Sequence, residues 1–167
     1  MGHEPSDIRD ARQAALQLLA RRDFGSAELA TKLRDKGFHE TIVADLVQAL
    51  QRERLIDDAR YAEHFVSYHA ARGQGPIRIG REMRRLQVPA ELIDRFLEEG
   101  QDWLDRARQA RRKKFGQVLP KDYAGKAKQA RFLQYRGFTG AQVRAALGSD
   151  IDLADIDLED DSQDTDA

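Results

Sequence analysis

The stretch LQYRGFTGAQVRAAL, residues 133–147, contains the signals of a helix end, a tight turn and a new helix start. Thr139, with a glutamine three positions later, forms the pattern of a capping box, in which each side chain satisfies a free backbone N–H group. Phe138 and Val143 have the spacing of a hydrophobic staple across the same turn. Gly137 occupies the position where a left-handed residue commonly ends a helix. The stretch therefore predicts two helices joined by a turn, with Thr139 capping the second.

The same pattern occurs twice more, at an offset of 50 residues each time. The other copies are LRDKGFHETIVADLV at residues 33–47 and MRRLQVPAELIDRFL at residues 83–97. In the second of these, Gln87 replaces the turn glycine, so we expect a different helix cap there. Self-similarity at a fixed period is typical of an array of small structural units.

Each copy is preceded by a further stretch in which apolar residues have helical spacing. In the first repeat this helix ends near Arg22, and Ser26 is expected to cap the helix that follows. In the second repeat, Asp57 and Asp58 are expected to act as caps, because carboxylates accept hydrogen bonds from free N–H groups and favour the positive end of a helix. The same two carboxylates lack a nearby third ligand, which excludes a metal or catalytic site. The alternation typical of β-strands is absent.

These patterns predict an all-α protein of nine helices in three tandem three-helix repeats. Each repeat is too small to bury a large core alone. We expect the repeats to stack on their sequence neighbours as an elongated curved array, with a compact globule of nine helices as the alternative. The expected organisation is a flexible N-terminus at 1–10, repeat 1 at 11–54, repeat 2 at 55–100, repeat 3 at 101–147 and an acidic disordered C-terminal tail at 148–167.

The net charge of −1 conceals an uneven distribution of charge along the chain. Residues 101–147 contain 12 basic and three acidic residues, a net charge of +9, whereas residues 148–167 contain nine acidic residues and no basic ones. Such asymmetry indicates nucleic acid or another polyanion as a partner. The acidic tail is interpreted either as a solubilising segment or as a DNA mimic that folds back onto the basic third repeat.

The composition excludes several classes of function. The chain has no cysteine, which rules out disulfides, thiolate metal sites and cysteine nucleophiles. No nucleophile, acid–base pair or metal-ligand set converges, so we expect no enzymatic activity and no cofactor. No apolar run reaches the ~20 residues of a membrane span, and the polar N-terminus does not resemble a signal peptide. We therefore expect a cytoplasmic protein without a membrane partner, and a monomer, because no heptad seam is present.

Basic residues are the candidates for contact with a partner. Arg60 lies in a first helical turn, where a cation is unfavourable, so it is expected to pair with a nearby carboxylate or else to reach a partner. Arg78, Arg81 and Arg85 are spaced three and four apart and project together; they track phosphates or an acidic groove, or form a solvated face beside Glu82. The full candidate set is Arg60, Arg72, Arg78, Arg81, Arg85, Arg108, Arg111, Arg112, Lys113, Lys114, Lys126, Lys128 and Arg131.

The densest basic run is residues 111–114, and its local charge exceeds what solubility requires. Contacts of this kind give salt-sensitive affinity for phosphates without reading base sequence. Six aromatic residues are interpreted as packing residues, with stacking platforms for unpaired bases as the alternative. They are Phe24, Tyr61, Tyr68, Tyr123, Phe132 and Tyr135.

Two blocks of residues stand out in the first two repeats. They are Leu18-Leu19, Arg22, Ser26, Glu28-Leu29, Lys32-Leu33 and Lys36-Gly37 in the first repeat, and Leu55 to Ala62 with Arg72-Gly73-Gln74-Gly75-Pro76 in the second. These two blocks, in this order, resemble the RecX family. The similarity runs from about Ala11 to Leu147 and is weaker in the third repeat; the acidic tail does not match the family pattern.

The resemblance implies a non-enzymatic regulator of the RecA recombinase. Members of the family are tandem three-helix repeats that lodge in the groove of the RecA–DNA filament. They limit filament extension, strand exchange, ATP hydrolysis and repressor cleavage. The implied partners are the RecA filament and, more weakly and without sequence specificity, single- and double-stranded DNA. The alternative from charge alone is a helical protein that binds DNA directly through its third repeat, without a recombinase partner.

Overall fold

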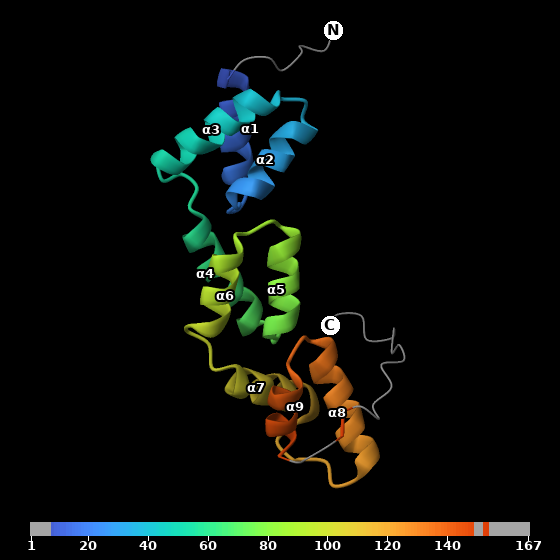
Figure 1. The fold of residues 1–167 in the computed structure, drawn as a ribbon. Helices are drawn as coiled ribbons and strands as arrows, with labels where there is room; N and C mark the ends of the chain where they lie inside the picture. Colours follow the sequence, from blue (N-terminus) through green and yellow to red (C-terminus); the bar gives the residue numbers. More distant parts are fainter. Residues whose placement is uncertain (1–7, 149–151, 154–167) are drawn as a thin grey trace. The chain divides into compact units, whose positions relative to one another are not determined.

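The computed structural model describes residues 8–148 and 152–153, which contain nine α-helices and no strand (Figure 1). The all-α fold predicted from the repeats is therefore confirmed. None of the helices in this part of the chain is long and apolar enough to cross a membrane. The helices are α1 (Ile8–Leu19), α2 (Ser26–Asp35), α3 (Glu40–Arg52), α4 (Asp58–Ala71), α5 (Pro76–Arg85), α6 (Ala90–Glu98), α7 (Trp103–Phe115), α8 (Tyr123–Tyr135) and α9 (Gly140–Leu147).

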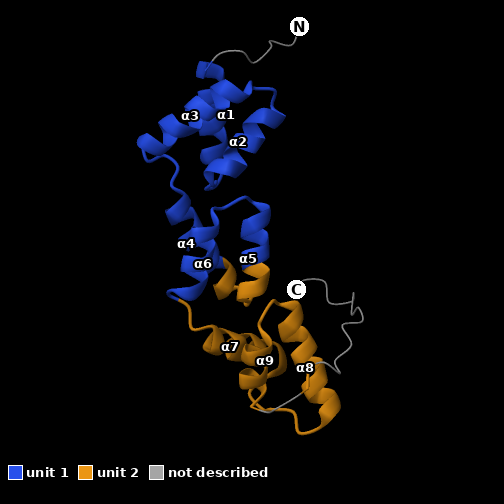
Figure 2. Ribbon diagram, in the orientation of Figure 1, with its two compact units in different colours: residues 1–68, 80–100 blue, residues 69–79, 101–167 orange. Residues whose placement is uncertain are grey.

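Three consecutive helices correspond to each sequence repeat, and the described chain divides into two compact units (Figure 2). Unit 1 contains the described residues of 1–68 and 80–100, and unit 2 contains those of 69–79 and 101–167. The division passes through α4 and α5. The second repeat therefore contributes residues to both units.

The staple residues of the first and third repeats lie in separate apolar cores. Phe38 and Val43 are buried with apolar residues of α1, α2 and α3. Phe138 and Val143 are buried with residues of α7, α8 and α9.

The acidic tail expected from position 148 lies outside the described residues, apart from its first residue and residues 152–153. Of these, Leu153 is half-buried and packs against the core of the third repeat.

The turn after the second helix is the same in all three repeats. Gly37, Gln87 and Gly137 have φ values of 92°, 58° and 93°. The residue that follows each one donates its N–H to the carbonyl five positions earlier, at 3.2, 3.0 and 3.1 Å respectively. This pair of features defines a Schellman turn. The expectation of a different cap at Gln87 is wrong, because Gln87 adopts the same left-handed conformation as the two glycines although it has a Cβ.

The start of α2 is capped by a residue of the second repeat. Ser26 is the first helical residue and Gly25 is the N-cap, so the prediction of Ser26 as the capping residue is wrong. Asp58, at the start of α4, accepts the Ser26 N–H at 2.7 Å on one carboxylate oxygen and the Ser26 hydroxyl at 2.6 Å on the other. Asp57 accepts the N–H groups of Ala59 and Arg60 at 3.0 and 3.1 Å, at the start of its own helix. The two adjacent aspartates therefore cap two different helices.

The N–H groups at the start of α5 are likewise accepted by another repeat, here by carbonyls of the turn that follows α8; both segments belong to unit 2. The Gly75 N–H donates to the carbonyl of Arg136 at 2.8 Å, and the Ile77 N–H donates to the carbonyl of Gly137 at 3.0 Å. A Cβ on Gly75 would lie 2.4 Å from the Gly137 backbone.

The start of α8, in contrast, is capped from within its repeat by Asp122, which accepts the Gly125 N–H at 2.9 Å. In α9, the Thr139 hydroxyl accepts from Gln142 and completes a capping box.

We predict that Gln87→Gly raises the free energy of unfolding by about 1 kcal/mol, because a left-handed residue with a Cβ is strained. The Gln87 side chain is exposed, so its removal uncovers no core. Gly37→Ala, at the equivalent turn of the first repeat, is expected to lower the same free energy by a similar amount. Urea-induced unfolding followed by circular dichroism measures both changes. A Gln87→Gly variant that is less stable than the parent would contradict the strain argument.

We predict that Asp58→Ala lowers the free energy of unfolding by about 2–3 kcal/mol, because it removes two hydrogen bonds to a carboxylate and leaves a helix N-terminus uncapped. Ser26→Ala removes the hydroxyl bond alone and is expected to cost about 1 kcal/mol. Because both variants act on one contact, the double variant should cost less than the sum of the single ones. Asp45→Ala, at an exposed aspartate of α3, is the control. Strictly additive losses would show that the two residues are not coupled.

Candidate polyanion-binding surface

Five arginines of unit 1 form ion pairs with glutamates. The Arg85 guanidinium lies 2.5 Å from a Glu82 carboxylate oxygen, and this hydrogen bond raises the pKa of Arg85. Exposed pairs of this kind contribute little stability, but they leave fewer positive charges to attract a polyanion. The five pairs are Arg12 with Glu53, Arg22 with Glu28, Arg34 with Glu40, Arg85 with Glu82 and Arg95 with Glu99.

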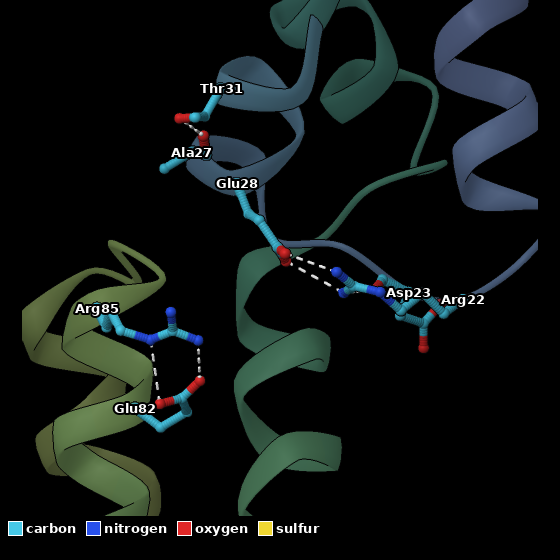
Figure 3. A network of polar contacts seen from close by, with 7 residues as sticks. All are labelled: Arg22, Asp23, Ala27, Glu28, Thr31, Glu82 and Arg85. Carbon is cyan, nitrogen blue, oxygen red and sulfur yellow. Dashed lines mark hydrogen bonds and ion pairs between the residues drawn. The ribbon is translucent and has the colours of Figure 1, made fainter. Parts of the chain in front are cut away.

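Residues of the two motif blocks form a polar contact between the first two repeats. Figure 3 shows Glu28 of α2 facing Arg22, with two hydrogen bonds of 3.1 and 2.6 Å between guanidinium and carboxylate. The same guanidinium lies 3.7 Å from the centroid of the Phe24 ring. Tyr61 of α4 is buried beside this pair; burial and, second, the charge of Glu28 raise the pKa of its phenol to about 12. These motif residues hold the repeats together and leave little of their charge for a partner.

The candidate arginines of the second repeat have different surroundings. Arg60, Arg72 and Arg81 are exposed. Within the described part of the chain, the side chains of Arg60 and Arg81 form no ion pair, so the expected pairing of Arg60 with a nearby carboxylate is not found. Arg78 is half-buried, and its guanidinium lies over the ring of Tyr135 at 5.6 Å from the centroid.

Arg111 is buried, so its assignment to the partner-binding set is wrong. The residue is 3% exposed, and it donates hydrogen bonds to the carbonyls of Gln117 at 3.1 Å and Val118 at 3.3 Å. A third, longer bond of 3.4 Å reaches the side chain of Gln129 on α8. Burial lowers the pKa of the guanidinium, which stays protonated all the same. The physical reason lies in the helix period, because Arg111 follows Ala107 by four residues and shares its buried face.

The remaining cations of the third repeat stay accessible. Arg112 lies 3.6 Å from Asp105, and Lys114 is exposed. Five other members of the candidate set have no ion-pair partner among the described residues, and we call them the free cations of the third repeat. Arg108, Lys113 and Lys128 are exposed and Lys126 and Arg131 are half-buried. Over the same described residues, no group of three or more His, Asp or Glu side chains is placed to hold a metal ion. The site therefore offers positive charge and hydrogen-bond donors, the groups that bind phosphates.

The aromatic residues divide into two groups. Phe24 and Tyr61 are buried, and Phe132 packs edge-on against Phe115 with ring centroids 5.3 Å apart. Tyr68, Tyr123 and Tyr135 are 58%, 60% and 76% exposed, so their interpretation as packing residues is wrong. A signal for Tyr135 was present in the sequence, because it follows Lys128 by seven residues and shares a helix face with it rather than with the buried Leu133.

Comparison with protein-family models places the three repeats in order. The models described as the first, second and third three-helix domains of RecX match residues 11–50, 57–97 and 101–147.

Curated relatives and solved structures agree with that match. A regulatory protein RecX of Halorhodospira halophila is 47% identical over 139 residues, which cover 83% of this chain and 86% of that protein. One of Vibrio campbellii is 41% identical over 138 residues, 82% of this chain and 89% of the relative. The crystal structure of RecX from Lactobacillus salivarius superposes with a TM-score of 0.72 at 20% identity, covering 84% of this chain and 94% of that one. The structural likeness supports the fold.

We predict that Arg111→Met lowers the free energy of unfolding by about 2 kcal/mol, because two loop carbonyls lose their charged donor in a buried place. Lys113→Met, two residues further along α7 and exposed, is expected to leave stability within about 0.5 kcal/mol of the parent. Thermal and urea unfolding compare the two variants. An Arg111→Met variant as stable as Lys113→Met would contradict a structural role for Arg111 and restore it as a candidate for partner contact.

Proposed function

Because the chain belongs to the RecX family of regulatory proteins, we propose that it restrains the RecA recombinase filament. It binds in the groove of the RecA–DNA filament and limits filament extension, strand exchange, ATP hydrolysis and coprotease activity. It acts stoichiometrically, by occupying the groove, and catalyses no reaction itself. A filament assembled on DNA in a bacterial cell places this activity in the cytoplasm.

The observation that carries the proposal is the concentration of net positive charge in the third repeat, where residues 101–147 contain 12 basic and three acidic residues. Five arginines of unit 1 pair with glutamates of the same unit, whereas the free cations of the third repeat have no such partner in the described chain. A filament groove combines a protein wall with DNA phosphates. We propose that the free cations of the third repeat contact the phosphates. The first two repeats, where Arg60, Arg72 and Arg81 are exposed, contact the recombinase.

Direct DNA binding without a recombinase is the second candidate function. The same free cations favour it, because phosphate contacts alone give affinity that depends on salt and on DNA length. The two candidates differ in one respect. Only the first requires a change in the activity of RecA.

We predict that the protein, added at a stoichiometric ratio, inhibits single-strand-DNA-dependent ATP hydrolysis by the RecA of its own host. The variant Lys113→Glu/Lys128→Glu is expected to inhibit less, because it loses phosphate contacts; its affinity for single-stranded DNA should fall and the slope of log K against log salt should shrink by about 1.4. Lys32→Glu/Lys36→Glu removes equal charge from exposed positions of the first repeat and is expected to keep the slope.

The outcomes separate the two functions. No inhibition of ATP hydrolysis at stoichiometric ratio would reject regulation of RecA. Salt-sensitive DNA binding without that inhibition would establish the second candidate in its place. Turnover of a nucleotide or nucleic acid by the protein alone would overturn both.

A further inference from the structure

Tyr135, the last residue of α8, presents an open aromatic ring on the surface of unit 2. It is 76% exposed, and the Arg78 guanidinium lies over its ring at 5.6 Å from the centroid. An isolated exposed tyrosine is common and needs no explanation. The guanidinium makes this one different, because a cation over one face holds the ring and leaves the opposite face open.

The surroundings of the ring are positively charged. Lys128 and Arg131 precede Tyr135 by seven and four residues and therefore lie on the same side of α8. At 1.5 Å per residue, Lys128 is about 10 Å along the helix from the ring. The sequence of α8, YAGKAKQARFLQY, contains no acidic residue. A ligand at the ring therefore meets cations from α8 and from Arg78.

The backbone fixes the position of Arg78 relative to the ring. The N–H groups of Gly75 and Ile77 donate to the carbonyls of the two residues that follow Tyr135, as described above. Gly137 approaches Arg78 so closely that a Cβ on it would lie 2.4 Å from the Arg78 Cβ. Both segments belong to the same compact unit (Figure 2). The arginine and the tyrosine are thus held together by the fold before any ligand arrives, which reduces the ordering that binding requires.

We propose that Tyr135, with Arg78, Arg131 and Lys128, forms a stacking site for an unpaired base of single-stranded DNA. The base stacks on the open face of the ring, and the cations contact the phosphates on either side. Aromatic rings set among cations bind single strands in this way, without regard to sequence, because every base has a π-face. A duplex does not fit the site, because its bases are already stacked on both sides.

A protein surface is the other class of partner that tyrosine and arginine attract. The charges favour nucleic acid, since a protein patch on this site would have to be acidic throughout. The inference goes beyond regulation of RecA, because it requires no recombinase. Its test is therefore a binding measurement with DNA alone.

The experiment compares three labelled probes at one salt concentration: an oligothymidylate of about 15 nucleotides, an abasic strand with the same number of phosphates, and a duplex. Fluorescence anisotropy gives the affinity of the full chain for each probe. The parent is expected to bind oligothymidylate more tightly than the abasic strand. Tyr135→Ala should weaken oligothymidylate binding by about tenfold, and leave the abasic strand and the duplex unchanged. Tyr135→Trp should retain the preference.

Tyr123→Ala is the matched control, because Tyr123 is an exposed tyrosine at the other end of α8 and is expected to contribute no stacking. Equal affinity of the parent for oligothymidylate and the abasic strand would overturn the proposal. So would an equal loss on all three probes, which would indicate a change in fold or charge. If Tyr135→Ala weakened only the inhibition of RecA, the ring would contact protein and the proposal would be wrong. Inhibition of ATP hydrolysis by the parent stays a separate readout, so failure here is distinguishable from failure of the proposed function.

Discussion

The free N–H groups at the start of a helix need acceptors, and for α2 and α5 the following repeat provides them. Asp58 of the second repeat accepts the first N–H of α2, and the carbonyls of Arg136 and Gly137 in the third repeat accept the N–H groups at the start of α5. An uncapped and partly buried helix end is unfavourable. Each of these two helices is therefore completed only when its neighbour is folded, which couples the repeats.

This coupling explains what the recognisable motif residues do. Asp58 and Tyr61 from α4 meet Ser26 and the Arg22–Glu28 pair of the first repeat, so residues far apart in the chain form one polar junction. Arginines placed there are neutralised by carboxylates and are poor candidates for phosphate contact. The net positive charge of the chain is concentrated in the third repeat, where residues 101–147 contain 12 basic and three acidic residues.

Much of the local structure was predictable because its causes are local. The capping box at Thr139 involves residues three apart, and the left-handed turns at Gly37 and Gly137 depend on the residue itself and its own helix. The predictions for Ser26 and Gln87 were wrong for the opposite reason. The acceptor of the Ser26 N–H lies in another repeat. Gln87 adopts the left-handed conformation of the shared turn without the glycine that would have predicted it.

The sequence by itself determined the repeat period, the helical class, the turn positions and the segregation of charge, because these depend on residue spacing and on residue type. Only the tertiary structure decided which cations remain accessible. Arg111 and Lys113 are two residues apart in one basic run, yet Arg111 is buried on loop carbonyls and Lys113 is exposed. The surroundings of Tyr135 were decided in the same way, because the cation over its ring comes from α5. The helix period places Arg111 on the same face as Ala107, but the loop carbonyls that accept its hydrogen bonds and the guanidinium over the Tyr135 ring come from other segments, which spacing does not encode.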